Sequence, residues 1–321
     1  MPDNDLKFNS LGELINLVIK YKDNRKRPRY ERIPFNLDLG NLINSIPSLI
    51  KLNNLIGMDL IKKNILDQIL FYSQGLNTNE MMHTCLMGPP GVGKTTLGKI
   101  LSELYCSLGF LSTDKFKIVS SVDLVAGFVG QSAIKTQTVL EESLGGVLFI
   151  DEAYSLSNGN NGDSSYSKEV IDTINKFLSE NTTNFIMIIA GYNEELERCF
   201  FSLNKGLRRR FTWNYDISKY STADLKNIFI YQVTTTKWKL DELVYDMLTD
   251  LFIENKLLFE NNGGDTLILF DKSKMCHSNR VFGKDKKYKM ILNITDITGA
   301  LKLFKEHKLL KCSPVPYGMY I

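Results

Sequence analysis

The sequence predicts an α/β protein: a three-layer α/β/α sandwich with a parallel sheet, followed by a mainly helical C-terminal part. Two continuous apolar runs, Val147–Ile150 and Phe185–Ala190, lack the polar alternation of a half-exposed strand. Such runs are typical of strands buried on both faces of a parallel sheet. Two further short apolar segments, Thr84–Met87 and Phe116–Val119, alternate with helical patterns, and this alternation indicates an α/β architecture.

Helical periodicity accounts for much of the sequence between and around these strands. Apolar residues recur at helical spacing in three segments, Leu11–Lys20, Met58–Leu70 and Val170–Leu178. The stretch Asn158–Ser167 is polar and rich in Gly, Asn and Ser, so it is predicted to be a surface loop.

A polar boundary near Asp216–Ser221 separates the α/β part from a C-terminal region whose pattern is mainly helical. We therefore expect three parts. Residues 1–50 form an N-terminal helical and basic extension, 51–218 a large α/β domain, and 219–321 a mainly α-helical subdomain. A chain of 321 residues is long enough for this division.

Composition excludes several classes of protein. No apolar run approaches the roughly 20 residues that span a bilayer, and Met1–Ser10 is too polar for the core of a secretory signal. Five cysteines are scattered without CxxC spacing, which favours free thiols in a reducing compartment. Cys276 beside His277 is interpreted as packing and not as a metal site. We expect a soluble, cytoplasmic or otherwise intracellular protein without a membrane partner.

Gly88–Thr95 reads GPPGVGKT and satisfies the phosphate-binding pattern GxxxxGK[ST]. It follows the predicted strand Thr84–Met87 and precedes an amphipathic helix, which is the context that this motif requires. Its glycines allow backbone N–H groups to approach phosphates closely, and the helix N-terminus adds partial positive charge. Lys94 is expected to reach the β- and γ-phosphates, and the Thr95 hydroxyl to bind Mg²⁺.

The segment Val147–Glu152 adds the second half of a nucleotide site. A buried strand delivers Asp151 and Glu152 at its C-terminal end, where ligands bind in open α/β sheets. Asp151 is expected to hold magnesium through water, and Glu152 to polarise the attacking water as a general base. Paired with the phosphate loop, these carboxylates favour hydrolysis of a nucleotide over its storage.

Four stretches in the order DLVAGFVGQSAIKT, GGVLFIDEAYSL, AGYNEELE and GLRRRF resemble the CbxX/CfqX group of AAA+ ATPases. That group includes the red-type Rubisco activase and stage V sporulation protein K. The resemblance covers about Leu55–Leu225. It implies an AAA+ fold, with the helical C-terminal subdomain acting as a lid. It also implies Mg²⁺ and ATP as cofactors and a ring, by analogy a hexamer, that pulls or threads a protein substrate.

The resemblance also implies roles for individual residues. Ile56 and Gly57 look like part of the segment that packs on the adenine. Phe128 and Val129 look like a pore loop that grips a polypeptide, although Phe128 could instead pack locally. Arg210, with Arg208 as the other candidate, looks like an arginine finger for the neighbouring subunit, the alternative being a solvated basic turn. The nucleotide-binding positions are thus Ile56, Gly57, Pro89, Pro90, Gly91, Val92, Gly93, Lys94, Thr95 and Thr96.

The sequence departs from the common AAA+ pattern at two sensor positions. Tyr192 stands where a polar Asn is usual, and Asn193 follows one residue later. A second sensor, usually an Arg of the lid, has no clear counterpart. Asp265 lies near the expected place, and Arg280 lies well beyond it.

The basic stretch Lys20–Arg32 leaves two interpretations open. It is either a solvated linker or inter-subunit face, or a contact for nucleic acid or an acidic partner. The net charge of +3 is small and does not by itself imply a nucleic-acid partner. A nucleic-acid-associated AAA+ motor is therefore the alternative to a protein remodeller.

Overall fold

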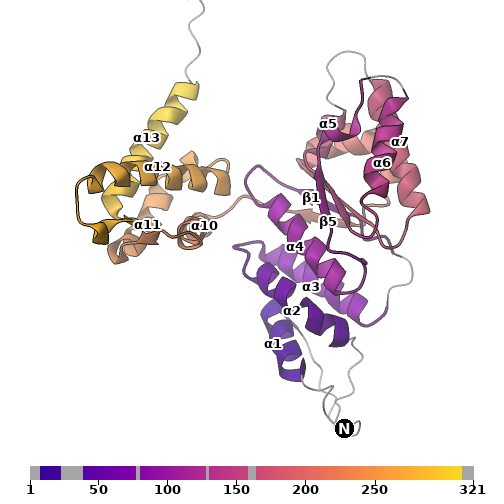
Figure 1. Cartoon of the computed structure of the whole chain (residues 1–321), viewed down its shortest axis with the longest axis horizontal. Coiled ribbons are helices and arrows are strands. Elements are labelled where there is room, and N and C mark those ends of the chain that lie inside the picture. The colour runs from indigo at the N-terminus through magenta and orange to yellow at the C-terminus, as the bar shows by residue number, and fades with distance from the viewer. Residues whose placement is uncertain (1–7, 23–38, 77–79, 128–129, 158–163, 313–321) are drawn as a thin grey trace, which may run out of the picture. The chain divides into compact units, whose positions relative to one another are not determined.

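The computed structural model describes residues 8–22, 39–76, 80–127, 130–157 and 164–312 (Figure 1). These residues form two compact units. The first comprises Met1–Gly88 with Lys94–Ile217, and the second comprises Pro89–Gly93 with Ser218–Ile321.

A parallel five-stranded sheet lies at the centre of the first unit. Its strands are β1 (Thr84–Met87), β2 (Phe116–Val119), β3 (Val147–Ile150), β4 (Ile186–Gly191) and β5 (Trp213–Asp216). They lie in the order β2-β3-β4-β1-β5. The expected bounds of β1, β2 and β3 are confirmed, and β4 lies one residue later than predicted. The edge strand β5 was not predicted, because only one of its four side chains is buried and its apolar pattern is weak.

Helices cover both faces of this sheet. Leu148 and Ile150 share a buried core with α6 (Gln131–Glu141) and α7 (Ser164–Glu180). Phe149 points to the opposite face, against Gly98 of the helix α4 (Lys94–Ser107). A Cβ atom at position 98 would lie only 2.6 Å from the Phe149 ring, so glycine is what allows α4 to approach the sheet. The predicted three-layer α/β/α class is confirmed.

The N-terminal helices pack against the α/β core of the first unit. Ser10 caps α1 (Leu11–Tyr21) by accepting a hydrogen bond from the Glu13 N–H. The helix α2 (Leu39–Asn53) lies between α1 and α4, and Lys51 of α2 forms an ion pair with Glu103 of α4 at 2.6 Å. The helix α3 (Asp59–Ser73) follows. Most of the basic stretch Lys20–Arg32 lies outside the described residues.

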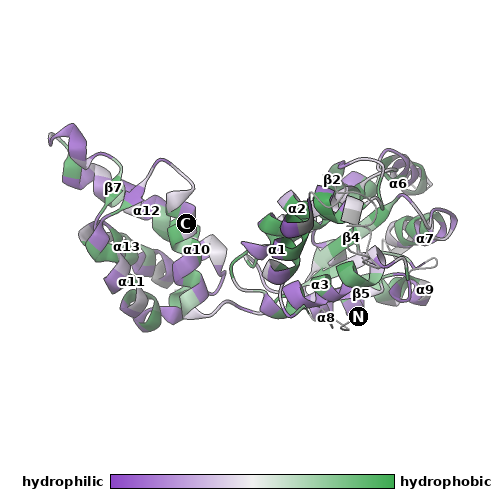
Figure 2. Cartoon of the chain, turned by 90° about the horizontal axis from the view of Figure 1, so that it is seen from below, coloured by the Kyte–Doolittle hydropathy of each residue, from purple (hydrophilic) through white to green (hydrophobic). Residues whose placement is uncertain are grey.

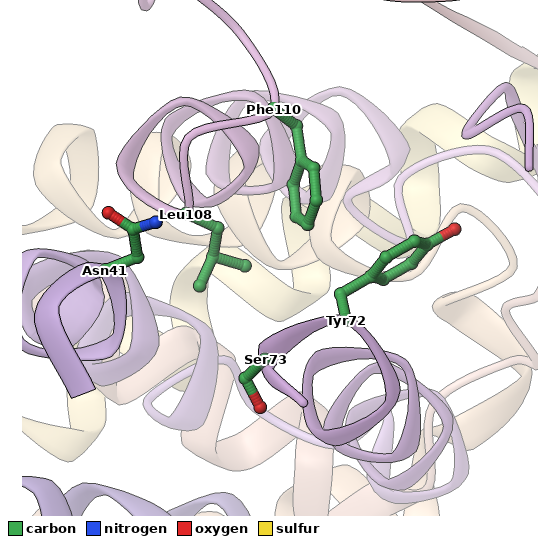
Figure 3. A pocket seen from close by; sticks show the side chains of 5 residues that line it. All are labelled: Asn41, Tyr72, Ser73, Leu108 and Phe110. Atoms are coloured by element: carbon green, nitrogen blue, oxygen red, sulfur yellow. The ribbon is translucent and has the colours of Figure 1, made fainter. Parts of the chain in front are cut away.

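A cavity of about 160 Å³ opens between the start of α2 and the ends of α3 and α4 (Figure 3). Asn41, Tyr72, Ser73, Leu108 and Phe110 line it. None of them belongs to the predicted nucleotide-binding positions.

Short elements connect the larger helices of the first unit. They are α5 (Ser121–Leu124), the turn Ala153–Leu156, α8 (Asn193–Glu195), the turns Leu196–Phe200 and Phe201–Leu203, and α9 (Lys205–Arg208). The predicted loop Asn158–Ser167 is wrong at its end, because α7 already begins at Ser164. The polar residues of the first turn of α7 mask the helical pattern that starts only at Val170.

The second unit is mainly helical, as predicted. Its helices are α10 (Thr222–Thr234), α11 (Glu242–Glu254), α12 (Gly263–Val281) and α13 (Ile294–Cys312), with short turns at Lys256–Leu258 and Lys286–Tyr288. Figure 2 shows both hydrophobic and hydrophilic residues along these helices. The apolar side chains meet in one core that includes Phe229, Phe252, Phe270 and Phe304. The two-residue strands β6 (Lys239–Leu240) and β7 (Ile291–Leu292) were too short to predict.

A buried ion pair ties α12, β7 and α13 together. The Asp296 carboxylate is 1% exposed and accepts hydrogen bonds from Arg280 at 2.7 Å and 2.8 Å. Arg280 also donates to the Ile291 carbonyl, and His277 lies 3.2 Å from the same carboxylate. Burial alone would raise the pKa of Asp296, but the hydrogen bonds from Arg280, the Asn293 backbone and His277 outweigh it and lower the pKa.

Four cysteines lie among the residues whose side chains the structure describes. Within the described ranges Cys85, Cys106, Cys199 and Cys276 are free thiols. Cys276 packs against the core of the second unit, in line with its interpretation as a packing residue. No helix in the described part of the chain is long and apolar enough to cross a membrane. The same residues contain no cluster of three or more His, Cys, Asp or Glu side chains that could hold a metal.

Replacing Arg280 tests the buried ion pair. Arg280→Ala leaves Asp296 buried without its main partner, so we expect a loss of about 3–5 kcal/mol in the free energy of unfolding near pH 7. Urea unfolding followed by circular dichroism measures it. In the parent chain the lowered pKa of Asp296 contributes stability above its unfolded pKa, near 4, and this contribution is lost as the pH falls below that value. Lys274→Ala breaks a more exposed pair with Asp271 and serves as the control. An Arg280→Ala chain as stable as that control would contradict this account.

Candidate functional site

The predicted phosphate loop connects β1 to α4 and has the backbone of a phosphate cradle. Three of its glycines have positive φ: Gly88 at 149°, Gly91 at 71° and Gly93 at 89°. A Cβ atom at position 88 would also lie 2.5 Å from the Ile217 carbonyl oxygen. Glycine is therefore required at these turns by backbone conformation and by close packing. The loop delivers Lys94 and Thr95 to the first turn of α4, where the helix N-terminus favours anions.

Lys94 lies over the loop that precedes it. Its ammonium group donates to the Gly88 carbonyl at 2.8 Å. Burial lowers the pKa of Lys94, and the nearby Asp151 and Glu152 carboxylates oppose that shift. A phosphate bound in the loop would add further negative charge near this half-buried ammonium.

Thr95 and Asp151 come together from α4 and from the end of β3. The Thr95 hydroxyl lies 3.5 Å from an Asp151 carboxylate oxygen, and the Glu152 N–H donates to the other carboxylate oxygen at 3.1 Å. Hydroxyl and carboxylate oxygens are the hard ligands that Mg²⁺ prefers. Thr95 and Asp151 lie beside the phosphate loop, so they fit as ligands of a magnesium ion bound together with a nucleotide.

Glu152 occupies an unusual backbone conformation at the tip of β3. Its φ of 47° places it in the left-handed region, from which the turn Ala153–Leu156 starts. The side chain is exposed, whereas Ala153 is fully buried. The turn thus leaves the Glu152 side chain accessible to solvent at the edge where ligands bind.

Tyr192 lies beside Lys94 because of the strand order. It follows β4, which lies between β3 and β1. Its ring centroid is 5.6 Å from the Lys94 ammonium nitrogen and 5.7 Å from the Tyr154 ring centroid. Asn193 begins α8 and is exposed. Of the two sensor candidates, Tyr192 is the one that lies against Lys94, and Tyr154 is a neighbour that the sequence analysis did not single out.

The tip of the phosphate loop belongs to the second unit. The Gly263 N–H donates to the Gly91 carbonyl at 3.0 Å, the Asn262 amide to the Pro90 carbonyl at 3.1 Å, and the Tyr220 hydroxyl to the Val92 carbonyl at 2.7 Å. Sequence reasoning gave no role to Tyr220 or Asn262. The Pro90, Gly91 and Val92 carbonyls therefore have partners within the second unit, and the Gly88 N–H donates to the Gly191 carbonyl at 3.1 Å.

Both candidates for the second sensor are held by other side chains. Asp265 lies in the first turn of α12 and is 1% exposed. It accepts from the Asn261 N–H at 2.8 Å and from Lys308 at 3.1 Å. Arg280 is engaged by Asp296, as described above. In this structure each of these charges therefore has a partner inside the second unit.

The arginine-finger candidates also have partners. Arg210 donates to the Gly206 carbonyl at 2.7 Å and to the Ser179 hydroxyl of α7. Arg208 forms an ion pair with Glu197 at 3.0 Å and donates to the Asn214 side chain at 2.7 Å. Arg209, between them, is exposed.

The remaining predicted positions lie in connecting segments. Ile56 and Gly57 are half-buried in the turn between α2 and α3, and Thr96 is exposed in α4. Phe128 and Val129, the predicted pore loop, lie outside the described residues.

Comparison with known proteins gives the class to which this fold and site belong. Residues 84–219 match the family model "ATPase family associated with various cellular activities (AAA)". The chain shares its fold with the AAA domain of FIGL-1, solved in complex with ADP, at a TM-score of 0.56, 17% identity and coverage of 78% of this chain and 83% of that one. A Thermotoga maritima RuvB mutant gives a TM-score of 0.54 at 19% identity, covering 78% of this chain and 72% of that one. Residues 84–219 are therefore similar to the AAA ATPase family, and the fold of the chain is that of AAA domains.

Sequence relatives indicate which group of AAA ATPases the chain resembles. A cfxQ-like protein of Acanthamoeba polyphaga mimivirus is 41% identical over 82% of this chain and 65% of its own length. Stage V sporulation protein K of Bacillus subtilis is 34% identical, over 60% of this chain and 61% of its own length. The ESX-3 secretion system protein EccA3 of Mycobacterium tuberculosis is 33% identical, over 56% and 27%. The chain is similar to AAA+ ATPases of the CbxX/CfqX type, and it spans less than two thirds of the length of each of these relatives.

Substitution of Lys94 tests the phosphate site. We expect Lys94→Ala to abolish nucleotide binding, because the phosphates lose the ammonium group that the loop carries towards them. Titration with a fluorescent ATP analogue measures the binding. Lys99→Ala removes an exposed lysine of the same helix and should bind like the parent chain. Affinity equal to that of the parent in Lys94→Ala would refute the role of this lysine.

Proposed function

We propose that this chain hydrolyses Mg²⁺-ATP within a ring, by analogy a hexamer, and uses the cycle to pull or remodel a protein partner. The observation that carries the proposal is the meeting of Lys94, Thr95, Asp151 and Glu152 at the C-terminal ends of β1 and β3. The match of residues 84–219 to the AAA ATPase family supports the ATPase activity. The names of the sporulation and secretion-system relatives support work on proteins.

Each residue at this edge has a proposed role in the reaction. The loop N–H groups and Lys94 bind the phosphates and stabilise the charge that develops on them. Thr95 and Asp151 hold the magnesium ion, which supplies further neutralisation of phosphate charge when bound. Glu152 accepts the proton of the attacking water. Tyr192, or Asn193 beside it, contacts the region of the terminal phosphate, and Ile56 and Gly57 pack on the base.

An arginine finger supplied by a neighbouring subunit of the ring would stabilise the charge of the transition state, and it contributes about 10³–10⁵ in rate. We assign it to Arg210 of an adjacent copy. Its hydrogen bonds to Gly206 and Ser179 would have to be exchanged when copies assemble. Phe128 and Val129 would form the substrate-gripping loop.

A nucleic-acid-associated motor is the alternative, supported by the basic stretch Lys20–Arg32. Binding of DNA or RNA that weakens steeply with salt would favour it. Capture of a defined protein by a hydrolysis-deficient ring, identified by mass spectrometry, would favour the remodeller.

Substitution of Glu152 tests its proposed role as the general base. Glu152→Gln is expected to bind ATP with unchanged affinity and to hydrolyse it about 10²–10⁴-fold more slowly, because the amide cannot accept the proton. Steady-state phosphate release and nucleotide titration measure the two quantities. Glu194→Gln changes an exposed carboxylate after β4 and should leave turnover intact. Unchanged turnover in Glu152→Gln would contradict the assignment of Glu152 as the general base.

Mixing two inactive variants tests whether Arg210 acts on the site of a neighbouring subunit. Arg210→Ala subunits have the base but lack the finger, and Glu152→Gln subunits have the finger but lack the base. Each alone is expected to be nearly inactive, whereas mixing them should restore turnover at interfaces where both groups meet. Arg209→Ala is the control and should hydrolyse ATP normally. Absence of recovery on mixing, or normal turnover by Arg210→Ala alone, would argue against Arg210 as the finger.

A further inference from the structure

Two tyrosines form a bridge between the two halves of the site. Tyr192 lies over Lys94, and its ring contacts Tyr154 at a centroid distance of 5.7 Å. Tyr154 belongs to the turn Ala153–Leu156, which begins directly after Glu152. The contacts therefore run in order from Lys94 through Tyr192 and Tyr154 to Glu152, all within the first unit.

The packing around Tyr154 fixes its ring. The Gly191 Cα lies against it so closely that a Cβ atom there would be 2.9 Å from Tyr154 Cδ1. The same added atom would be 3.0 Å from the Leu196 side chain, so Gly191 leaves room for both neighbours. With Tyr192 on another side, the aromatic ring has little freedom to move. A hydroxyl on a ring held in this way is itself held in place.

The Tyr154 hydroxyl is a neutral donor close to a charged acceptor. Burial, the charge of Glu152 and the hydrogen bond of Glu152 with this phenol together raise the pKa of Tyr154 to about 12. The phenol therefore keeps its proton throughout the neutral range and can donate it to the carboxylate. Glu152 itself is exposed and stands on a left-handed residue, so burial does not hold its side chain in place.

We propose that Tyr154 is a positioning residue for ATP hydrolysis: its hydroxyl donates a hydrogen bond to the Glu152 carboxylate and directs it towards the phosphate loop. The inference rests on the proposed role of Glu152 as the base. A carboxylate oxygen bonded to Tyr154 leaves the other oxygen for the attacking water. Because the Tyr154 ring packs on Tyr192, which lies over Lys94, the base is placed relative to the residue that binds the phosphates.

Removal of the hydroxyl tests this role without removing the ring. In the full-length chain, Tyr154→Phe is expected to lower kcat by roughly 10-fold, the scale of one hydrogen bond to a charged group, with KM for ATP and the melting temperature unchanged. Tyr231→Phe removes the hydroxyl of an exposed tyrosine of α10 and should have no effect. Unchanged kcat in Tyr154→Phe, a raised KM alone, or a chain that fails to fold would each overturn the proposal.

A double-mutant cycle separates positioning from a general effect on structure. If Tyr154 acts through Glu152, then Tyr154→Phe should cause no further loss in the Glu152→Gln background. An equal loss in both backgrounds would overturn the proposal. The cycle also separates this inference from the function on which it rests. Slow hydrolysis by Glu152→Gln together with normal turnover by Tyr154→Phe refutes the positioning role alone, whereas normal turnover by Glu152→Gln refutes the base itself.

Discussion

The order β3-β4-β1 in the parallel sheet is the constraint on which the site depends. Parallel strands all present their C-terminal ends at one edge, so the phosphate loop after β1 and the carboxylates after β3 face the same side. Because β4 separates these strands, Tyr192 falls between the two groups and contacts Lys94. A sheet in which β3 paired directly with β1 would leave no place for the tyrosine bridge.

Charge pairing distinguishes the buried carboxylates, which have a structural role, from the exposed carboxylate that is proposed to act in catalysis. Asp265 and Asp296 are almost fully buried, and a buried carboxylate needs a partner or a hydrogen-bond network, which Lys308, Arg280 and the surrounding N–H groups provide. Arg280 is thereby committed to the core of its own unit. Glu152, in contrast, is exposed at the tip of a strand, with the Tyr154 phenol and the Lys94 ammonium near it. Burial with bound partners gives Asp265 and Asp296 a structural role, whereas exposure leaves Glu152 available for its proposed catalytic role.

The similarity to AAA ATPases lies in the nucleotide-binding part of the chain. The AAA match covers residues 84–219, which contain the loop, the DE pair and the three arginines. The N-terminal helices α1 and α2 lie outside that match and pack on the α/β core through contacts such as Lys51–Glu103. The relatives carry names from sporulation and secretion, and each is longer than the part that aligns. The partner on which the proposed ring works is therefore the open question for experiment.

The sequence by itself determined the strands β1, β2 and β3, the phosphate loop and the DE pair, because buried apolar runs and a glycine-rich motif depend on local residue types. The start of α7 and the strand β5 could not be predicted, since their polar residues carry little periodic signal. Only the tertiary structure decided that Arg280 meets Asp296 and that Tyr154 meets Tyr192. These contacts join residues 16 and 38 positions apart, and their proximity follows from the packing of whole elements and from no local pattern.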